Sequence, residues 1–401
     1  MLTSTPFPAT RFPAPSRRTN KLSLACAAVA VAITSAAVLT PASAAPNYNI
    51  ISLGVVVAGD TSGTGTGVSP NGQYVTGYSG NNTGNHALLW QSGTGSTPLP
   101  NLTSPARAYN MPQSVNNSGT AAGTSATTFF GSSPLPVMWK NNTATAFPLP
   151  GGQTIGRAFS INGTETAVGS VDGGSTEAAA RFTMGGSSVL TQTMPNGGVL
   201  KTAYGINDAG RIVGQALDPA NAAVTKGFYL DPGDSTATDI GALSTLGHNS
   251  AIPFGVSTNG RITGSSSINS GVDSQPFIYI AGVGMQQVPI PAGTTTGQGR
   301  GVNASGWVVG NSSSVTSIPF LYDGVTSVSL QSLLVSAPGW DLTSGTSNAA
   351  FSISDTGVIT GRGLLNGVIT GFVMVPVPEP TAIGLLSAIP LAARRRRRAR
   401  T

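Results

Sequence analysis

Only two histidines, His86 and His248, occur in the 401 residues of this chain, and they limit the chemistry that it can support. A nucleophilic triad needs a histidine beside a carboxylate. Asp239 lies nine residues before His248, and nothing in the sequence brings the two together. The single cysteine, Cys26, falls in an N-terminal apolar run. We therefore expect no Ser/His mechanism, no thiol chemistry and no His-rich or Cys-rich metal site.

The acidic residues provide few candidates for catalysis or metal binding. Glycoside cleavage requires two carboxyl groups that converge on one bond, and the candidates are Asp208, Asp273, Asp323, Asp355 and Glu177. Asp208 and Asp355 occupy the same place in an internal repeat, which predicts that they cap turns. The stretch nearest to a calcium loop, Asp231-Pro232-Gly233-Asp234, supplies too few oxygen ligands. The sequence predicts no catalytic residue, no metal and no cofactor.

Aromatic side chains are the remaining candidates for ligand contact. Trp307 and Trp340 break the repeat pattern, and our hypothesis is that these two are exposed and stack on a ligand. The other large aromatic residues recur at equivalent repeat positions, which predicts a core between repeat units; they are Trp90, Trp139, Phe182, Tyr229, Tyr279 and Tyr322.

The charge is distributed unevenly along the chain. The formal net charge is +6, but residues 45–376 contain 10 basic and 13 acidic residues and carry −3. The positive charge lies at the two ends. A weakly acidic body cannot hold a phosphate backbone by counterion release, so we do not expect nucleic-acid binding.

A short motif repeats seven times along the body. It consists of a small residue, an aliphatic residue, Asn or Ser, two turn residues, Gly, any residue, two mainly β-branched residues and Gly. Taken at the aliphatic position, the spacings are 47, 46, 45, 50, 46 and 51 residues. In the third copy, Glu165 replaces the first glycine. The copies are GVSPNGQYVTG (67–77), SVNNSGTAAG (114–123), SINGTETAVG (160–169), GINDAGRIVG (205–214), GVSTNGRITG (255–264), GVNASGWVVG (301–310) and SISDTGVITG (352–361).

Each copy is typical of a strand, a tight turn and a second strand. An aromatic strand follows, such as HALLW at 86–90, and then a weaker fourth segment, such as ATDIGAL at 237–243. Four short strands in about 47 residues is the size of a propeller blade. The last copy lacks a fourth strand, whereas NYNIISLG at 47–54 stands alone before the first.

We therefore predict an all-β fold, a seven-bladed β-propeller of four-stranded blades. Residues 47–54 would complete the last blade and leave no open edge. The alternative is an open β-solenoid, for which the period is long and the N-terminal strand has no role.

The repeat resembles the HAF-type probable extracellular repeat of exported bacterial proteins. DIGALSTLGHNSAIPFGVSTNGRITGSS at 239–266 gives the fullest match, and His86 to Trp90 match the strand that names the family. The resemblance implies an exported repeat protein and assigns no reaction to it.

The N-terminus has the layout of a secretory signal peptide. A basic stretch precedes an apolar run from Leu22 to Leu39. The small-x-small site that follows predicts cleavage after Ala44, so that the signal covers residues 1–44 and involves Ala42, Ala44 and Ala45. An uncleaved anchor helix is the alternative, because the run is about 18 residues long.

Residues 376–401, after the repeat domain at 45–375, resemble the PEP-CTERM sorting signal. Thirteen residues of the apolar segment 381–393 reach about 20 Å as a helix, short of the bilayer core. Flanking arginines would stop transfer on the cytoplasmic side. The resemblance implies transient retention at the inner membrane and processing by an exosortase; a permanent tail anchor is the alternative. The motif residues are Pro378, Glu379, Pro380, Arg394, Arg395, Arg396, Arg397 and Arg398.

Two classes of function remain open. The first is a non-catalytic protein of the cell surface or extracellular matrix of a Gram-negative-type bacterium, binding exopolysaccharide or another surface protein. The second is an extracellular propeller-type glycan hydrolase or lyase. Scarce ionisable residues and short insertions rich in Ser, Thr and Gly favour the first, because a grafted active site usually interrupts a repeat.

Overall fold

The computed structural model describes residues 45–128, 132–172 and 177–378. The signal residues Ala42 and Ala44 and the tail residues Glu379, Pro380 and Arg394 to Arg398 lie outside these ranges, whereas Ala45 and Pro378 lie inside them. No helix in the described ranges is both long enough and apolar enough to cross a membrane.

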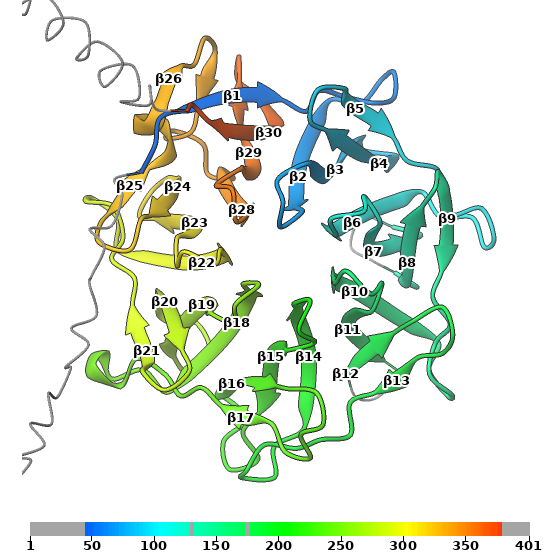
Figure 1. Ribbon diagram of the computed structural model, residues 1–401, viewed down its shortest axis with the longest axis vertical. Coiled ribbons are helices and arrows are strands. Elements are labelled where there is room, and N and C mark those ends of the chain that lie inside the picture. The colour runs from blue at the N-terminus through cyan, green and yellow to red at the C-terminus, as the bar shows by residue number, and fades with distance from the viewer. Residues whose placement is uncertain (1–44, 129–131, 173–176, 379–401) are drawn as a thin grey trace, which may run out of the picture. The chain divides into compact units, whose positions relative to one another are not determined.

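The repeats build seven sheets that surround a central axis (Figure 1). Each repeat contributes an inner strand, two middle strands and, in six of the seven blades, its own outer strand, all paired antiparallel within the blade. A single bridge, between Asn85 and Tyr109, joins the first two sheets.

The first four blades run through residues 62–239. Their strands are β2 (Ser62–Val68), β3 (Tyr74–Asn81), β4 (Gly84–Gln91) and β5 (Gly95–Pro98); β6 (Tyr109–Val115), β7 (Ala121–Ala126), β8 (Leu135–Lys140) and β9 (Thr143–Ala146); β10 (Ile155–Ile161), β11 (Ala167–Asp172), β12 (Glu177–Phe182) and β13 (Ser188–Val189); and β14 (Leu200–Ile206), β15 (Ile212–Leu217), β16 (Thr225–Leu230) and β17 (Thr238–Asp239).

The last three blades follow, with two short 3-10 helices, η1 (Ser244–Leu246) and η2 (Leu330–Leu333). Their strands are β18 (Ser250–Val256), β19 (Ile262–Ile268), β20 (Val272–Ile280) and β21 (Gly284–Gln287); β22 (Thr296–Val302), β23 (Val308–Ser313), β24 (Ser317–Tyr322) and β25 (Ser327–Ser329); and β28 (Ala349–Ile353), β29 (Ile359–Leu365), β30 (Val368–Pro376) and β1 (Tyr48–Ser52).

The N-terminal strand β1 closes the ring, as the sequence predicts. It runs antiparallel to β30, in a register from Tyr48 opposite Pro376 to Ser52 opposite Phe372. The Tyr48 hydroxyl, buried in the last blade, donates to the Gly357 carbonyl at 3.1 Å. The fold is therefore a β-propeller whose last blade draws strands from both ends of the body, and the solenoid alternative is wrong.

One feature of the last blade was not expected from sequence. Residues 331–350 are not a plain loop, since they contain β26 (Leu334–Ser336) and β27 (Trp340–Asp341). β26 pairs in parallel with the outer side of β1, and β27 pairs with β29. The closing strand is thus covered on its outer edge, which removes a row of unpaired backbone groups.

The core lies between neighbouring blades. Third-strand phenylalanines are fully buried: Phe228, Phe277, Phe320 and Phe372 occupy the same place in the last four blades, and Phe182 lies two residues further along the third strand of blade three. Trp90 and Trp139 are buried too, and Tyr229, Tyr279 and Tyr322 are half-buried, so the predicted role of the repeated aromatic residues in the core is confirmed.

The Asn/Ser position of the repeat connects each blade to the next. All seven side chains at this position are buried. The Asn207 amide donates to the carbonyl of Ser257 in the next blade at 3.0 Å, while its oxygen accepts the Arg211 N–H of its own turn at 3.0 Å. The serine side chains bond only within their own turn, as when Ser257 accepts the Arg261 N–H at 2.9 Å and donates to Asn259 at 2.7 Å. Asn116, Asn162 and Asn303 repeat the crossing bond to the next blade.

This difference between repeats gives a testable prediction. Asn207→Ser keeps the turn bond and loses the crossing bond, which should lower the free energy of unfolding by about 1 kcal/mol. Asn207→Ala loses both and leaves buried groups unpaired, which should cost about 2 kcal/mol or more. Urea unfolding measures both variants. Equal stability of the serine and alanine variants would contradict the assignment of two separate bonds.

Candidate functional site

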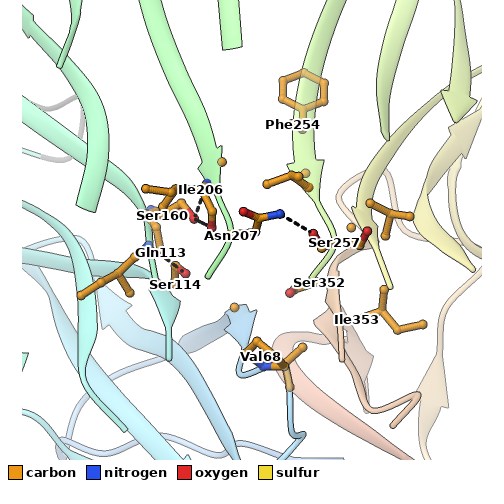
Figure 2. Close-up of a pocket in the computed structure, with 18 of the residues that line it drawn as sticks. Val68, Gln113, Ser114, Ser160, Ile206, Asn207, Phe254, Ser257, Ser352 and Ile353 are labelled. Carbon is orange, nitrogen blue, oxygen red and sulfur yellow. Dashed lines mark hydrogen bonds between the residues drawn. The ribbon is translucent and has the colours of Figure 1, made fainter. Parts of the chain in front are cut away.

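A β-bulge interrupts every inner strand one residue before the small residue of the repeat motif. Such bulges redirect a side chain relative to its strand. All seven bulge residues line one cavity of about 170 Å³ on the axis of the ring. We call these seven residues the collar: Thr66, Gln113, Phe159, Tyr204, Phe254, Arg300 and Phe351. Figure 2 shows Gln113 and Phe254 at the cavity, together with Ser160 and Ser352 of the motif.

The small residues that follow the collar allow this close assembly. A Cβ on Gly301 would lie 2.9 Å from the Cα of Ser352 in the next blade. Two serines at this position bond the backbone of the next blade: Ser160 accepts the Ile206 N–H at 3.2 Å, and Ser114 accepts the Ile161 N–H at 3.4 Å. The inner strands thus meet almost backbone to backbone and hold the collar in place.

Aromatic rings and a guanidinium group contact one another in a row along one side of the collar, with the Phe159 and Tyr204 rings tilted by 41° and the Tyr204 and Phe254 rings edge-on at 66°. The ring centroids of Phe159 and Tyr204 are 5.4 Å apart, as are those of Tyr204 and Phe254. The Arg300 guanidinium lies 4.4 Å from the Phe254 centroid. Across the last blade, Arg362 lies 5.6 Å from the Phe351 centroid. Such contacts are favourable and fix the orientation of each plane.

Two polar side chains of the collar are left without partners in the described ranges. The Nε of Arg300 is buried and has no hydrogen-bond partner. The Gln113 amide, half-buried at the same cavity, makes no side-chain hydrogen bond. Thr66 differs, because its hydroxyl donates to the Pro112 carbonyl at 2.6 Å. Aromatic rings with a few unpaired polar groups beside them are typical of a site for a small ligand.

Burial governs the electrostatics of the collar. It raises the pKa of Tyr204, with the negative Glu177 carboxylate as the next cause, so this hydroxyl stays neutral. Burial also lowers the pKa of Arg300; Tyr204 opposes this shift and Arg362 adds to it. Arginine nevertheless remains charged in proteins. The collar therefore carries a desolvated positive charge.

The turns at the end of the inner strands form the mouth of the cavity. Asp208 and Asp355 were expected to cap their own turns, but they accept hydrogen bonds from the turn of the preceding blade. Asp208 accepts the Gly163 N–H at 2.6 Å, and Asp355 accepts the Ala304 N–H at 2.8 Å. Asp355 also accepts from the Thr258 hydroxyl at 2.7 Å. These exposed acids reinforce the ring of turns.

A second cavity, of about 540 Å³, lies where blades three and four meet. Asp231, on one wall, holds Arg211 through two nitrogen–oxygen contacts of 2.7 Å. Arg181, at the same cavity, is exposed and has no ion-pair partner within the described residues.

The histidines find partners that the sequence did not reveal. His86 Nδ1 lies 3.0 Å from both carboxylate oxygens of Asp60, a residue from the connection before β2. Ser79 donates to the same carboxylate, not to the imidazole, so the Ser–His bond that activates a nucleophile is missing from this group. His248 is buried beside Ser266, at 3.2 Å, and not beside Asp239.

Our hypothesis for the two irregular tryptophans is wrong for Trp340 and is not supported for Trp307. Trp340 is 9% exposed and packs edge-on against Phe372 inside the last blade, because β27 folds onto β29. Trp307 is half-buried and packs against the hydrophobic core of the last blade.

Sequence reasoning missed the collar. The repeat alignment starts at the small residue, and the collar is the position immediately before it. That position carries Thr, Gln, Phe, Tyr and Arg in different copies, so it shows no pattern of its own. The two polar collar residues that stay unpaired are visible only once the bulges bring them together.

Comparison with known proteins supports the fold and goes no further. No protein-family model matches the chain, and no curated protein does. The β-propeller domain of the Trilobed protease from Pyrococcus furiosus, which has an open velcro topology, is similar with a TM-score of 0.51 and 8% identity, over 80% of this chain and 98% of that one.

Two further structures are similar at lower scores. TolB from Acinetobacter baumannii has a TM-score of 0.42 and 11% identity, over 65% of this chain and 60% of that one. A prolyl endopeptidase has a TM-score of 0.46 and 9% identity, over 83% of this chain and 51% of that one. The chain thus spans about half the length of the endopeptidase.

Proposed function

We propose that the propeller is the binding module of an exported, non-catalytic protein of the bacterial surface or extracellular matrix, and that its ligand is an exopolysaccharide. The proposal of export rests on the two terminal sequences, whose resemblances imply secretion, an exosortase as processing partner and brief retention at the inner membrane. The proposal of binding rests on the collar.

The observation that carries the proposal is that aromatic rings and unpaired polar groups line one cavity. Sugars present an apolar face to aromatic rings and hydroxyl groups to amides and guanidinium groups. The collar offers the half-buried rings of Tyr204 and Phe254 together with the free groups of Gln113 and Arg300. A hydrolase would need two carboxyl groups facing the bound sugar. The two acids at the mouth, Asp208 and Asp355, instead accept hydrogen bonds from the turns.

Binding by the body, residues 45–378, can be tested with the producing bacterium's own exopolysaccharide. We expect saturable co-sedimentation and no new reducing or unsaturated chain ends. The double variant Gln113→Ala/Phe254→Ala should weaken binding about tenfold or more, since it removes one polar and one stacking contact. The matched control is Tyr322→Ala, which removes an aromatic residue on a third strand.

Three outcomes would count against the proposal. New chain ends that disappear when a carboxylate is changed to an amide would make the protein an enzyme. Equal binding by the double variant and the wild type would move the site away from the collar. Neither binding nor cleavage would indicate a protein partner.

A further inference from the structure

The charge of Arg300 is not balanced by any carboxylate in the described ranges. Some basic side chains there are paired with acids, as Arg211 is with Asp231 and Lys140 with Glu165, both at 2.7 Å, whereas the unpaired Arg181 is exposed to solvent. Arg300 instead lies over the Phe254 ring, at 4.4 Å from its centroid, and no carboxylate lies within ion-pair distance of it in the described ranges. Arg362 donates to the Ser347 carbonyl at 2.7 Å.

The two acids that line the cavity, Asp208 and Asp355, already accept hydrogen bonds. Both oxygens of Asp355 accept hydrogen bonds, from the Ala304 N–H and the Thr258 hydroxyl. One oxygen of Asp208 accepts the Gly163 N–H. An unpaired charge that is largely withdrawn from water costs stability, so Arg300 is the cation of the cavity that a bound anion would stabilise.

We infer that Arg300 receives a carboxylate of the ligand, so that the central cavity selects an acidic sugar. This inference rests on the proposed function and specifies its ligand class. A guanidinium offers a rigid fork of N–H donors that matches a carboxylate in two parallel bonds. Stacking on Phe254 holds the plane of that fork at the cavity wall, and the Gln113 amide remains for a hydroxyl group.

The size of the cavity limits how the sugar is presented. Its volume of about 170 Å³ is well below the ~300 Å³ at which pockets enclose larger ligands. It accommodates one sugar unit, so the group bound is a chain end or a side branch, and the polymer backbone stays outside the mouth.

Titration calorimetry with two single sugars tests this inference at constant ionic strength. Methyl β-glucuronide should bind the 45–378 body at least about tenfold more tightly than methyl β-glucoside, because only the former carries a carboxylate. Arg300→Gln should abolish the preference, and Arg300→Lys should retain part of it. Arg181→Gln, which removes a charge at the second cavity, is the matched control and should change nothing.

The same variants separate binding from folding. Arg300→Gln should melt at or above the wild-type temperature, because it removes a buried unpaired charge. A clear loss of stability would make Arg300 a structural residue and overturn the inference. Equal affinity for both sugars, or loss of the preference in Arg181→Gln, would overturn it as well.

The inference and the proposed function can fail separately. If the exopolysaccharide co-sediments but neither single sugar binds, the acidic-end inference is wrong and polysaccharide binding stands. If the polysaccharide does not bind at all, the proposed function fails with it. If sodium chloride or acetate alone displaces the glucuronide fully at equal ionic strength, the site holds small anions only and the inference is again overturned.

Discussion

Gly169→Ala will lower the free energy of unfolding by about 3 kcal/mol or more, and will yield little soluble protein, because overpacking a buried strand has no simple relief. Gly169 is the last glycine of the third repeat and lies on the second strand of its blade, opposite the bulge. A Cβ there would lie far inside 3.0 Å of the Arg157 carbonyl oxygen.

The same geometry recurs in every blade. A Cβ on the last glycine of each repeat would meet the carbonyl two residues before the collar, on the adjacent inner strand. The glycines are Gly77, Gly123, Gly169, Gly214, Gly264, Gly310 and Gly361. This explains why the motif ends in glycine: the bulge that turns the collar residue toward the axis also pushes a carbonyl against the second strand.

Gly151→Ala is the matched control for Gly169→Ala. Gly151 lies on an exposed turn, its backbone is not left-handed, and a Cβ there would meet nothing within 4 Å. Urea unfolding should show this variant within about 0.5 kcal/mol of the wild type. A Gly169→Ala protein that unfolds at the wild-type urea concentration would contradict the bulge geometry.

Removal of residues 45–54 will destabilise the whole propeller, by more than about 10 °C in melting temperature. The deletion takes away β1, with Tyr48 fully buried and Leu53 3% exposed. Loss of one buried large side chain alone costs about 2–5 kcal/mol. It also exposes the edge of β30, where unpaired backbone groups promote aggregation.

Thermal melting and light scattering measure this effect. A chain that ends at residue 378 is the control, since it keeps both β1 and β30 and should melt like the longer protein. A peptide of residues 45–54, added to the deleted chain, should raise its melting temperature by refilling the last blade. If the deleted chain melts at the same temperature as the control, closure of the ring by β1 does not stabilise the propeller, and the prediction is wrong.

Closure by β1 also brings the two predicted processing sites together. Ala45 packs against the last blade, and the Val377 N–H donates to the Asn47 carbonyl at 2.8 Å. The residue after the predicted signal cleavage and the first residue of the Pro-Glu-Pro motif therefore lie at the same end of the β1–β30 pair. Trimming at either site leaves the closing strands intact.

The sequence predicts the propeller architecture well because the same pattern of strands and turns recurs in seven copies. Turn glycines, the Asn/Ser position and the aromatic third strand follow directly from local physics, and the lone strand at 47–54 predicts closure. The collar is not predictable in this way, because a bulge adds a residue to the strand without a residue type of its own.

Contacts between segments that are distant in the sequence are the second feature that the sequence does not predict. Trp340 looks exposed in a Ser- and Gly-rich insertion, yet β27 pairs with β29 and buries it. Asp60 and His86 are 26 residues apart, and only the packing of the β1–β2 connection against β4 unites them. Each case depends on how a loop folds over a blade, which no repeat pattern records.

The central claim is that the ligand binds at the collar, and hydrogen–deuterium exchange of the 45–378 body, with and without the exopolysaccharide, tests it most directly. We predict slower exchange in peptides that cover the bulges of β6, β10, β14, β18 and β22, with little change in the outer strands. Protection confined to the second cavity, around Arg181 and Asp231, or found only on outer strands, would contradict the claim.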